Sequence, residues 1–225
     1  MYRKELIDKI TDVPLFREIT PQNLEAMLDC LGATARTYSR SEYISLIDDA
    51  IQNVGVVVTG QVKMIKEDVW GNSSVLTAIE PGGVFGETFT CGSSDVAAVS
   101  FMASKDSEII FLPFEKVMHT CTMTCRFHHR LIENMVAQIA DKNMQLMNKM
   151  DIVIKKTLRE KIMTYLSNEA EAQQSTYFTV PLGRVELADY LLVDRSALTR
   201  ELNNMRDDGL IDFDRNTFRI LMQNQ

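Results

Sequence analysis

The stretch that decides the fold reads VELADYLLVDRSALTRELNNMR and runs from Val185 to Arg206. Its apolar residues fall into two groups at helical spacing, the first at Leu187, Ala188 and Leu191 and the second at Leu198, Leu202 and Met205. Asp194 directly precedes the second group and suits an N-cap, because its carboxylate can accept from the unpaired N–H groups of a first helical turn. The pattern predicts two helices joined by a tight turn, with Val193 buried in the turn.

The second of these helices carries, opposite its apolar face, residue types that read DNA. Arginine can bond guanine through two hydrogen bonds, asparagine suits adenine, and serine and threonine are permissive. A helix laid in the major groove would present them to the bases. The predicted DNA-binding residues are Arg195, Ser196, Thr199, Arg200 and Asn203.

The flanking residues complete a winged helix-turn-helix over residues 155–225. Thr157-Leu158-Arg159-Glu160 matches a capping box that starts a helix, which Ile162, Tyr165 and Leu166 would bury. Gly209 is placed to end the second helix of the pair. A strand over 177–182 and a hairpin over 210–213 and 218–221 would form the wing.

Three observations speak against this interpretation. An ordinary amphipathic helix pair on a protein surface would give the same pattern, and Leu192 occupies the turn position where glycine is usual. The net charge is -7, and residues 151–225 hold 10 lysines and arginines against 12 acidic residues. DNA binding would therefore depend on local placement and on salt concentration, with the charge supplied by Arg195, Arg200, Arg206, Arg215 and Arg219.

The composition fits a globular protein of two domains, with 225 residues that are 45% hydrophobic and 24% charged. No apolar run approaches the roughly 20 residues of a membrane span, and the N-terminus lacks a signal-peptide core. The four cysteines form no dense framework, which favours reduced thiols. We expect a cytoplasmic protein that does not contact a membrane.

Residues 37–113 change to a period of two and predict an antiparallel β-sandwich or jelly roll. Before them, Thr20-Pro21 opens a helix whose buried stripe is Leu24, Met27, Leu28 and Leu31 and which Gly32 ends. The expected strands are 54–58, 62–65, 75–79, 96–102 and 109–112. A roll of this size could be a metal-dependent enzyme, but the histidines (His119, His128, His129) all follow the strands, so we predict no catalytic residues and no enzyme.

Residues 114–154 turn helical again and carry two series of residues spaced by seven. The series Ile132, Ile139, Leu146, Val153 and the series Val136, Asn143, Met150 together predict a parallel coiled-coil seam between two chains. A polar residue such as Asn143 at a seam position typically sets register and strand number. The alternative is that this helix packs on its own roll. Residues 151–156 are the expected hinge.

A β-roll, a long dimer helix and a C-terminal winged helix in this order resemble the Crp/Fnr family of bacterial transcription regulators. The resemblance covers nearly the whole chain, and its most specific parts are residues 185–211 and Pro81-Gly82-Gly83-Val84-Phe85-Gly86-Glu87, which looks like the start of the family's phosphate cassette. It implies an α+β fold with a cyclic-nucleotide-binding-like effector roll (1–118), a dimerisation helix with hinge (119–154) and a DNA-binding domain (155–225). It also implies a homodimer, operator DNA and RNA polymerase as partners.

The resemblance places an effector pocket at Gly86, Glu87, Thr88, Ala97, Ala98, Leu146 and Met147. Cyclic-AMP-binding relatives hold the ribose with the counterpart of Glu87 and grip the phosphate with an Arg-Ser pair, whose positions here are Ala97 and Ala98. A buried phosphate without a cation is costly. We therefore expect an effector other than cyclic AMP, of unknown identity. Only Cys30 lies where the oxygen-sensing members carry closely spaced cluster-binding cysteines, so an iron–sulfur cluster is not expected.

The sequence thus predicts a dimeric DNA-binding regulator gated by an effector in the roll and acting on a palindromic operator. By resemblance, Arg195 and Arg200 contact guanines or phosphates, and Ser196 loosens discrimination among bases. One alternative is a redox, metal or haem sensor that uses Cys121, Cys125 and His128, with His119 and His129 nearby; the other interpretation of that cluster is two buried thiols and exposed imidazoles. An alternative of another class is a ligand-binding module whose helix-turn-helix contacts protein.

Overall fold

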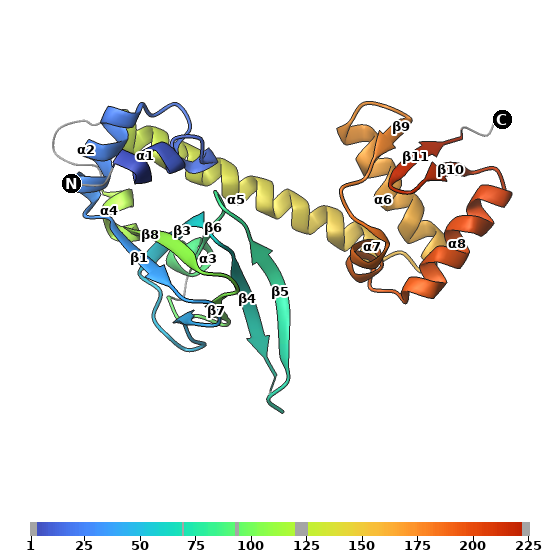
Figure 1. The fold of residues 1–225 in the computed structure, drawn as a ribbon, viewed down its shortest axis with the longest axis horizontal. Coiled ribbons are helices and arrows are strands. Elements are labelled where there is room, and N and C mark those ends of the chain that lie inside the picture. Colours follow the sequence, from blue (N-terminus) through green and yellow to red (C-terminus); the bar gives the residue numbers. More distant parts are fainter. Residues whose placement is uncertain (1–3, 69, 93–94, 120–125, 222–225) are drawn as a thin grey trace. The chain divides into compact units, whose positions relative to one another are not determined.

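The computed structural model describes residues 4–68, 70–92, 95–119 and 126–221. They divide into two compact units, residues 1–140 and 141–225. Helix α5 (Arg126–Val153) begins in the first unit and ends in the second (Figure 1). Within the described ranges, no helix has both the length and the apolar composition that a membrane crossing requires.

The first unit is built on two antiparallel four-stranded sheets, as the period of two predicted. One sheet has the order β1 (Thr34–Tyr38), β8 (Ser107–Pro113), β3 (Asn53–Thr59), β6 (Val84–Phe85). The other has the order β2 (Tyr43–Ser45), β7 (Ser100–Ala103), β4 (Val62–Glu67), β5 (Ser73–Ile79). The predicted β-roll is therefore confirmed.

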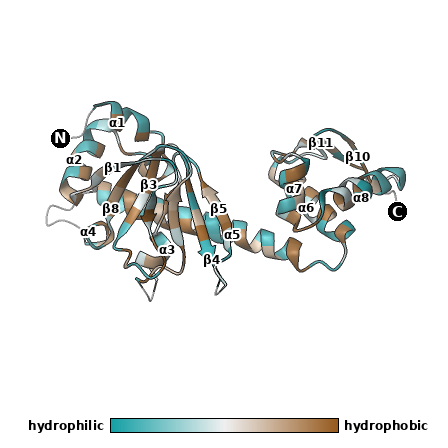
Figure 2. Cartoon of the chain, turned by 60° about the horizontal axis from the view of Figure 1, so that its bottom comes forward, coloured by the Kyte–Doolittle hydropathy of each residue, from teal (hydrophilic) through white to brown (hydrophobic). Residues whose placement is uncertain are grey.

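Strand β3 shows why the roll has two cores. Its run Val54–Val58 is buried on both faces, because alternate side chains enter different clusters. Val57 faces the other sheet and packs with Phe101 of β7, whereas Val54 and Val56 pack against helices. Figure 2 shows the hydrophobic colouring along these strands. One sheet is thus sandwiched between the second sheet and a helical layer.

The helical layer is α1 (Lys4–Ile10), a 3₁₀ turn η1 (Pro14–Phe16), α2 (Pro21–Leu31), α4 (Phe114–Met118) and the start of α5. Helix α2 begins at Pro21 after Thr20 and ends at Gly32, which adopts φ 62°, and its four predicted stripe residues are all buried. The Thr20 hydroxyl does not cap the helix; it accepts from the Asn23 amide at 2.7 Å. Helix α1 was not predicted.

Three expected segments differ from the structure, and one of them is the strand expected over 177–182, which ends at Thr179. The strand expected over 96–102 is only Ser100–Ala103, because residues 96–97 pair with a loop instead: the Ala97 N–H donates to the Asp49 carbonyl at 2.9 Å, and Val96 forms an isolated bridge with Ala50. The helix expected from residue 114 is two helices, α4 and α5, with residues 120–125 between them outside the described part.

The second unit packs the end of α5, three further helices and a three-stranded sheet around one core. The further helices are α6 (Leu158–Ala172), α7 (Arg184–Leu191) and α8 (Arg195–Asp207), and the strand order is β10 (Ile211–Asp214), β11 (Thr217–Ile220), β9 (Tyr177–Thr179). Thr157 and Glu160 form the predicted capping box at the start of α6. All the predicted apolar residues of α6, α7 and α8 are buried, while Val193 is half-buried against the same core.

Candidate functional site

The N-terminus of α8 is fixed by Asp194, as its position in the sequence predicted. The Asp194 carboxylate accepts from the backbone N–H groups of Ser196 at 2.7 Å and Ala197 at 3.2 Å. The Ser196 hydroxyl also donates to it. These bonds lower the pKa of the Asp194 carboxyl below its usual range, and the bond from the Ser196 hydroxyl has the largest effect. The charged cap therefore holds the first turn of α8 at neutral pH.

The predicted reading face of α8 is on the surface. Arg195, Ser196, Thr199 and Arg200 are exposed, and Asn203 is half-buried. The Thr199 hydroxyl donates to the Arg195 carbonyl of its own helix at 2.9 Å, and the Ser196 hydroxyl donates to its cap. By contrast, the Arg195 and Arg200 side chains make no hydrogen bond or ion pair with any residue that the structure describes. Their guanidinium groups can therefore engage an outside partner.

Two carboxylates, that of Glu201 in α8 and that of Asp208 directly after it, pair with Arg159 of α6. The Arg159 Nε lies 2.6 Å from Glu201 Oε1, and its Nη1 lies 2.7 Å from Asp208 Oδ2. On a helical wheel, Glu201 and Asp208 lie away from Arg195 and Arg200. Arg159 thus neutralises carboxylates behind the reading face, which lessens the difficulty raised by the net charge of the domain. The sequence did not single out this residue.

Two arginines, one in α7 and one in α8, contact the hairpin that forms the wing. Arg184 Nη2 donates to the Arg215 carbonyl at 2.7 Å, and its guanidinium stacks over Phe213 and Phe218 at 5.0 and 5.1 Å from the ring centroids. Arg206 lies over Phe213 at 5.1 Å. Burial lowers the pKa of Arg184. Arg215 itself stands at the turn of the hairpin with φ 51°.

The cassette residues of the first unit surround the short helix α3 (Glu87–Thr90). Gly86 precedes it with φ 83°, and a Cβ at this position would lie 2.9 Å from the Asn53 carbonyl oxygen, so glycine is required. Glu87 and Ala97 are buried, whereas Thr88 and Ala98 are exposed. The positions where the resemblance expects a phosphate-binding pair thus carry two methyl groups.

The remaining residues of the predicted effector pocket and of the seam lie on α5. Leu146 and Met147 belong to the second unit and are 58% and 54% exposed. Of the seam residues, Ile132 and Ile139 are partly buried against the core of their own first unit. The others are exposed: Val136, Asn143, Leu146, Met150 and Val153. Figure 2 shows hydrophobic segments along this exposed part of α5.

The Cys/His cluster is only partly described. His119 Nδ1 lies 2.7 Å from the Glu115 carbonyl, His129 pairs with Glu133 at 3.3 Å, and His128 is buried. Cys121 and Cys125 lie outside the described residues. Within the described part of the chain, no three histidine, cysteine or acidic side chains are grouped as metal ligands would be.

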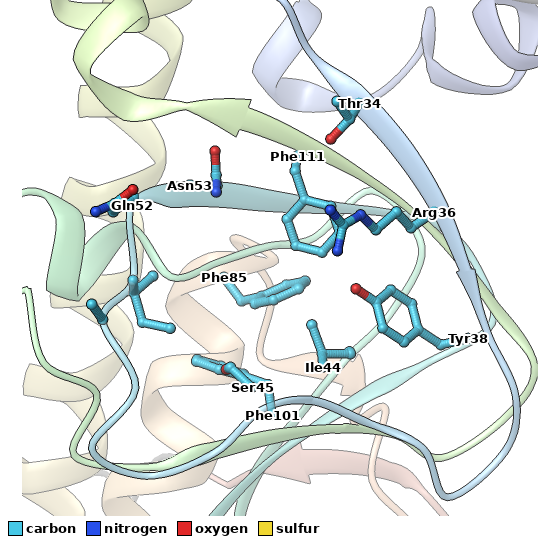
Figure 3. A pocket seen from close by; sticks show the side chains of 12 residues that line it. Thr34, Arg36, Tyr38, Ile44, Ser45, Gln52, Asn53, Phe85, Phe101 and Phe111 are labelled. Carbon is cyan, nitrogen blue, oxygen red and sulfur yellow. The ribbon is translucent and has the colours of Figure 1, made fainter.

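The roll also contains a cavity that differs from the predicted effector pocket. It opens beside Arg36 and Tyr38 of β1 and is floored by phenylalanines (Figure 3). None of the predicted effector-pocket residues lines it. The alternation of Thr34, Arg36 and Tyr38 along one strand face was a signal that could have pointed to it.

Comparison with known proteins agrees with the two units. Residues 35–122 match the family profile of the cyclic nucleotide-binding domain, and residues 160–224 match that of the Crp-like helix-turn-helix domain. A curated relative, the transcriptional activator protein FnrA of Stutzerimonas stutzeri, is 21% identical over 205 residues, which are 89% of this chain and 81% of the relative.

Solved structures share the fold. The catabolite activator protein of Thermus thermophilus is 20% identical, with a TM-score of 0.53 over 92% of this chain and 93% of that one. The c-di-GMP-responsive global regulator CLP of Xanthomonas campestris is 18% identical, with a TM-score of 0.55 over 89% of this chain and 98% of that one. With an effector-type roll, a long helix and a Crp-like helix-turn-helix domain in this order, the chain belongs to the Crp/Fnr family of transcription regulators.

Proposed function

We propose that this protein is a homodimeric, sequence-specific regulator whose roll binds an effector other than cyclic AMP. Two copies joined along α5 would set two α8 helices on operator half-sites about one helical turn apart. The effector would shift the population of dimers whose α8 helices match that spacing. RNA polymerase is the expected partner at the promoter.

The observation that carries this proposal is the arrangement of charge on α8. Arg195 and Arg200 are exposed and form no hydrogen bond or ion pair with the described residues, while Arg159 pairs with Glu201 and Asp208. A single acidic chain can therefore offer a locally basic, arginine-bearing surface to DNA. We propose Arg195, Ser196, Thr199, Arg200 and Asn203 as the residues of this interface.

A substitution of Arg200 tests the proposed DNA interface. Bound duplexes are first selected from a random pool, and the binding of the selected duplex is then measured over a series of salt concentrations. Arg200→Ala should weaken binding to that duplex by about 1–3 kcal/mol, because an arginine that bonds two acceptors of one base contributes about this much. Arg40→Ala is the matched control, since Arg40 is an exposed arginine of the first unit, outside the helix-turn-helix. Equal binding by the Arg200 variant and the wild type would remove Arg200 from the interface.

The proposal that the effector is not cyclic AMP depends on two residues of the cassette. Ala97 and Ala98 offer neither a cation nor a hydroxyl to a cyclic phosphate, and an anion buried without such partners is destabilised. We therefore expect no calorimetric signal of cyclic AMP binding at micromolar concentrations. Micromolar affinity would contradict the proposal that another molecule is the effector, while leaving the DNA interface untouched.

A further inference from the structure

The cavity beside β1 has the size of a single aromatic ring. Its volume is about 170 Å³, and it lies between β1, β2 and residues 50–53 of the roll (Figure 3). An apolar cavity of about 150 Å³ in another protein binds benzene. Pockets for drug-sized ligands start at about 300 Å³. Size alone therefore selects a one-ring molecule.

The floor and one wall of the cavity are aromatic. Phe85 lies with its ring centroid 4.9 Å from that of Phe101 and 6.3 Å from that of Phe111, and Tyr38 meets Phe111 edge-on at 6.3 Å. Phe85 and Phe101 are buried, and Phe111 is half-buried. Aromatic pairs prefer edge-to-face and tilted contacts at these distances, and a ligand ring in the cavity would find the same kind of partner.

Arg36 and Ser45 supply two of the polar groups that line the cavity. Arg36 pairs in register with Ile109, a buried core residue, so both side chains lie on the inner face of their sheet. Figure 3 shows the Arg36 guanidinium directed toward the ring of Phe111. Among the described residues, no carboxylate forms an ion pair with Arg36. The Ser45 hydroxyl oxygen is buried and finds no hydrogen-bond partner there either.

The nearest acidic residue on these paired strands does not neutralise Arg36. Glu108 pairs with Thr37, one position along, and therefore points to the outer face of the sheet. Its carboxylate lies 3.0 Å from the Lys9 ammonium. The guanidinium at the mouth of the cavity is thus available to an anion.

We propose that this cavity binds a one-ring aromatic carboxylate, with the ring against Phe85, Phe101 and Phe111, the carboxylate on the Arg36 guanidinium, and a polar ring substituent at Ser45. Carboxylates bind arginine through two parallel hydrogen bonds, which also orient the ring. The site is separate from the cassette pocket that the resemblance implies, because it shares no lining residue with that prediction.

The wall of the cavity is physically continuous with the cassette. The Ile51 N–H donates to the Asp95 carbonyl at 2.7 Å, and Ala50 forms a bridge with Val96. The Asn53 carbonyl lies against Gly86, where even a Cβ would not fit. A ligand that contacts residues 50–53 therefore acts on the segment that precedes Ala97, which gives the site a route to the proposed gating.

The test uses the full-length protein and two fluorinated probes, 4-fluorobenzoate and its neutral analogue 4-fluorobenzamide, followed by ¹⁹F NMR. We expect saturable binding of 4-fluorobenzoate. Arg36→Gln should weaken that binding at least about tenfold and leave 4-fluorobenzamide within about twofold, because only the carboxylate uses the charge. Arg40→Gln, a nearby exposed arginine outside the cavity lining, is the matched control and should bind both probes as the wild type does.

A second variant acts on the cavity rather than on the charge. A Cβ at Gly55 would lie 2.3 Å from the Phe85 ring, so Gly55→Ala should push the ring into the cavity and abolish binding of both probes. Thermal melting of each variant checks that the fold is kept. No saturation by about 10 mM 4-fluorobenzoate, or equal binding by Arg36→Gln and the wild type, would overturn the proposal.

The regulatory role of the ligand rests on the proposed function, and the two can fail separately. Protein that binds 4-fluorobenzoate but no duplex DNA would support the cavity and contradict the DNA-binding proposal. Protein that binds its duplex but not 4-fluorobenzoate would overturn the cavity proposal alone. A duplex affinity that shifts with 4-fluorobenzoate in the wild type, but not in Arg36→Gln, would support both.

Discussion

His128 is a buried imidazole near the start of α5. It is 2% exposed, and neither ring nitrogen has a hydrogen-bond partner among the described residues. It borders a hollow shared with Cys30, Glu115, Lys116 and His119. Burial lowers the pKa of His128 below its usual value of 6.5, because the charged imidazolium would lose its hydration.

This burial predicts how stability changes with pH. Below about pH 6.5 the unfolded chain binds a proton that the folded chain resists, so the free energy of unfolding should fall as the pH decreases from 6.5. Above that pH the contribution of His128 is complete. Urea midpoints measured from pH 8 to pH 5 should show this fall in the wild type and a flatter profile in His128→Leu.

His129 provides the control, because it is exposed next in sequence and pairs with Glu133. His129→Gln should keep the slope of the wild type between pH 6.5 and pH 5. If the His128 and His129 variants give the same slope, burial of His128 does not set the acid sensitivity of the protein.

At the scale of elements, the turn between α7 and α8 depends on an unfavourable residue. Leu192 adopts φ 56° and ψ 50°, the left-handed region that costs a side chain with a Cβ roughly 1–2 kcal/mol. Its side chain is 64% exposed, so it contributes little burial in return. The sequence pointed to this position because glycine is usual there, and the structure shows that the turn forms without it.

Leu192→Gly should therefore stabilise the protein by about 0.5–1 kcal/mol, after the greater freedom of glycine in the unfolded chain offsets part of the relieved strain. Chemical unfolding followed by circular dichroism measures the change. Leu192→Val should destabilise, since a β-branched residue tolerates a positive φ least. A glycine variant less stable than the wild type would show that Leu192 holds the turn through contacts rather than despite strain.

The elements that sequence analysis found are those whose periodicity and end signals agree. Helix α2 has its stripe, Pro21 and Gly32, and α8 has its stripe and Asp194, so local chemistry and burial predict the same boundaries. The prediction of a strand over residues 96–102 was wrong because the Ala97 N–H donates to a loop carbonyl 48 positions away in sequence. No period within one segment reports such a pairing.

The candidate site likewise contains residues that the sequence predicts and residues that it does not. The reading face of α8 follows from helical periodicity, so its residues could be named in advance. Arg159 could not, because its ion pairs join residues 42 and 49 positions apart whose approach depends on tertiary packing. The cavity beside Arg36 needs strands from both sheets and a loop, and its ring-sized volume is a property of packing alone.

At the scale of the whole molecule, α5 sets the expected assembly. Its N-terminal part is covered by the core of its own first unit, through Leu131, Met135 and partly Ile132. Farther along, Val136, Leu146 and Met150 are each about 60% exposed on one side of the helix, which is an unusual amount of apolar surface for a helix to leave in water. A second copy of α5 packed in parallel would cover them.

Met150→Glu should therefore convert the proposed dimer into a monomer. Burial of a methionine side chain contributes about 1.5–3 kcal/mol, and a symmetric seam loses it twice, so the dimer dissociation constant should rise at least about 100-fold. Sedimentation equilibrium measures this constant directly. The matched control is Gln145→Glu, which places the same charge at an exposed position on the other side of the helix.

With the dimer lost, binding to a two-half-site duplex should fall to that of a single half-site, because the second contact is no longer intramolecular. A Met150→Glu protein that sediments as a dimer would exclude this part of α5 from the seam and leave the spacing of the two α8 helices without its proposed support.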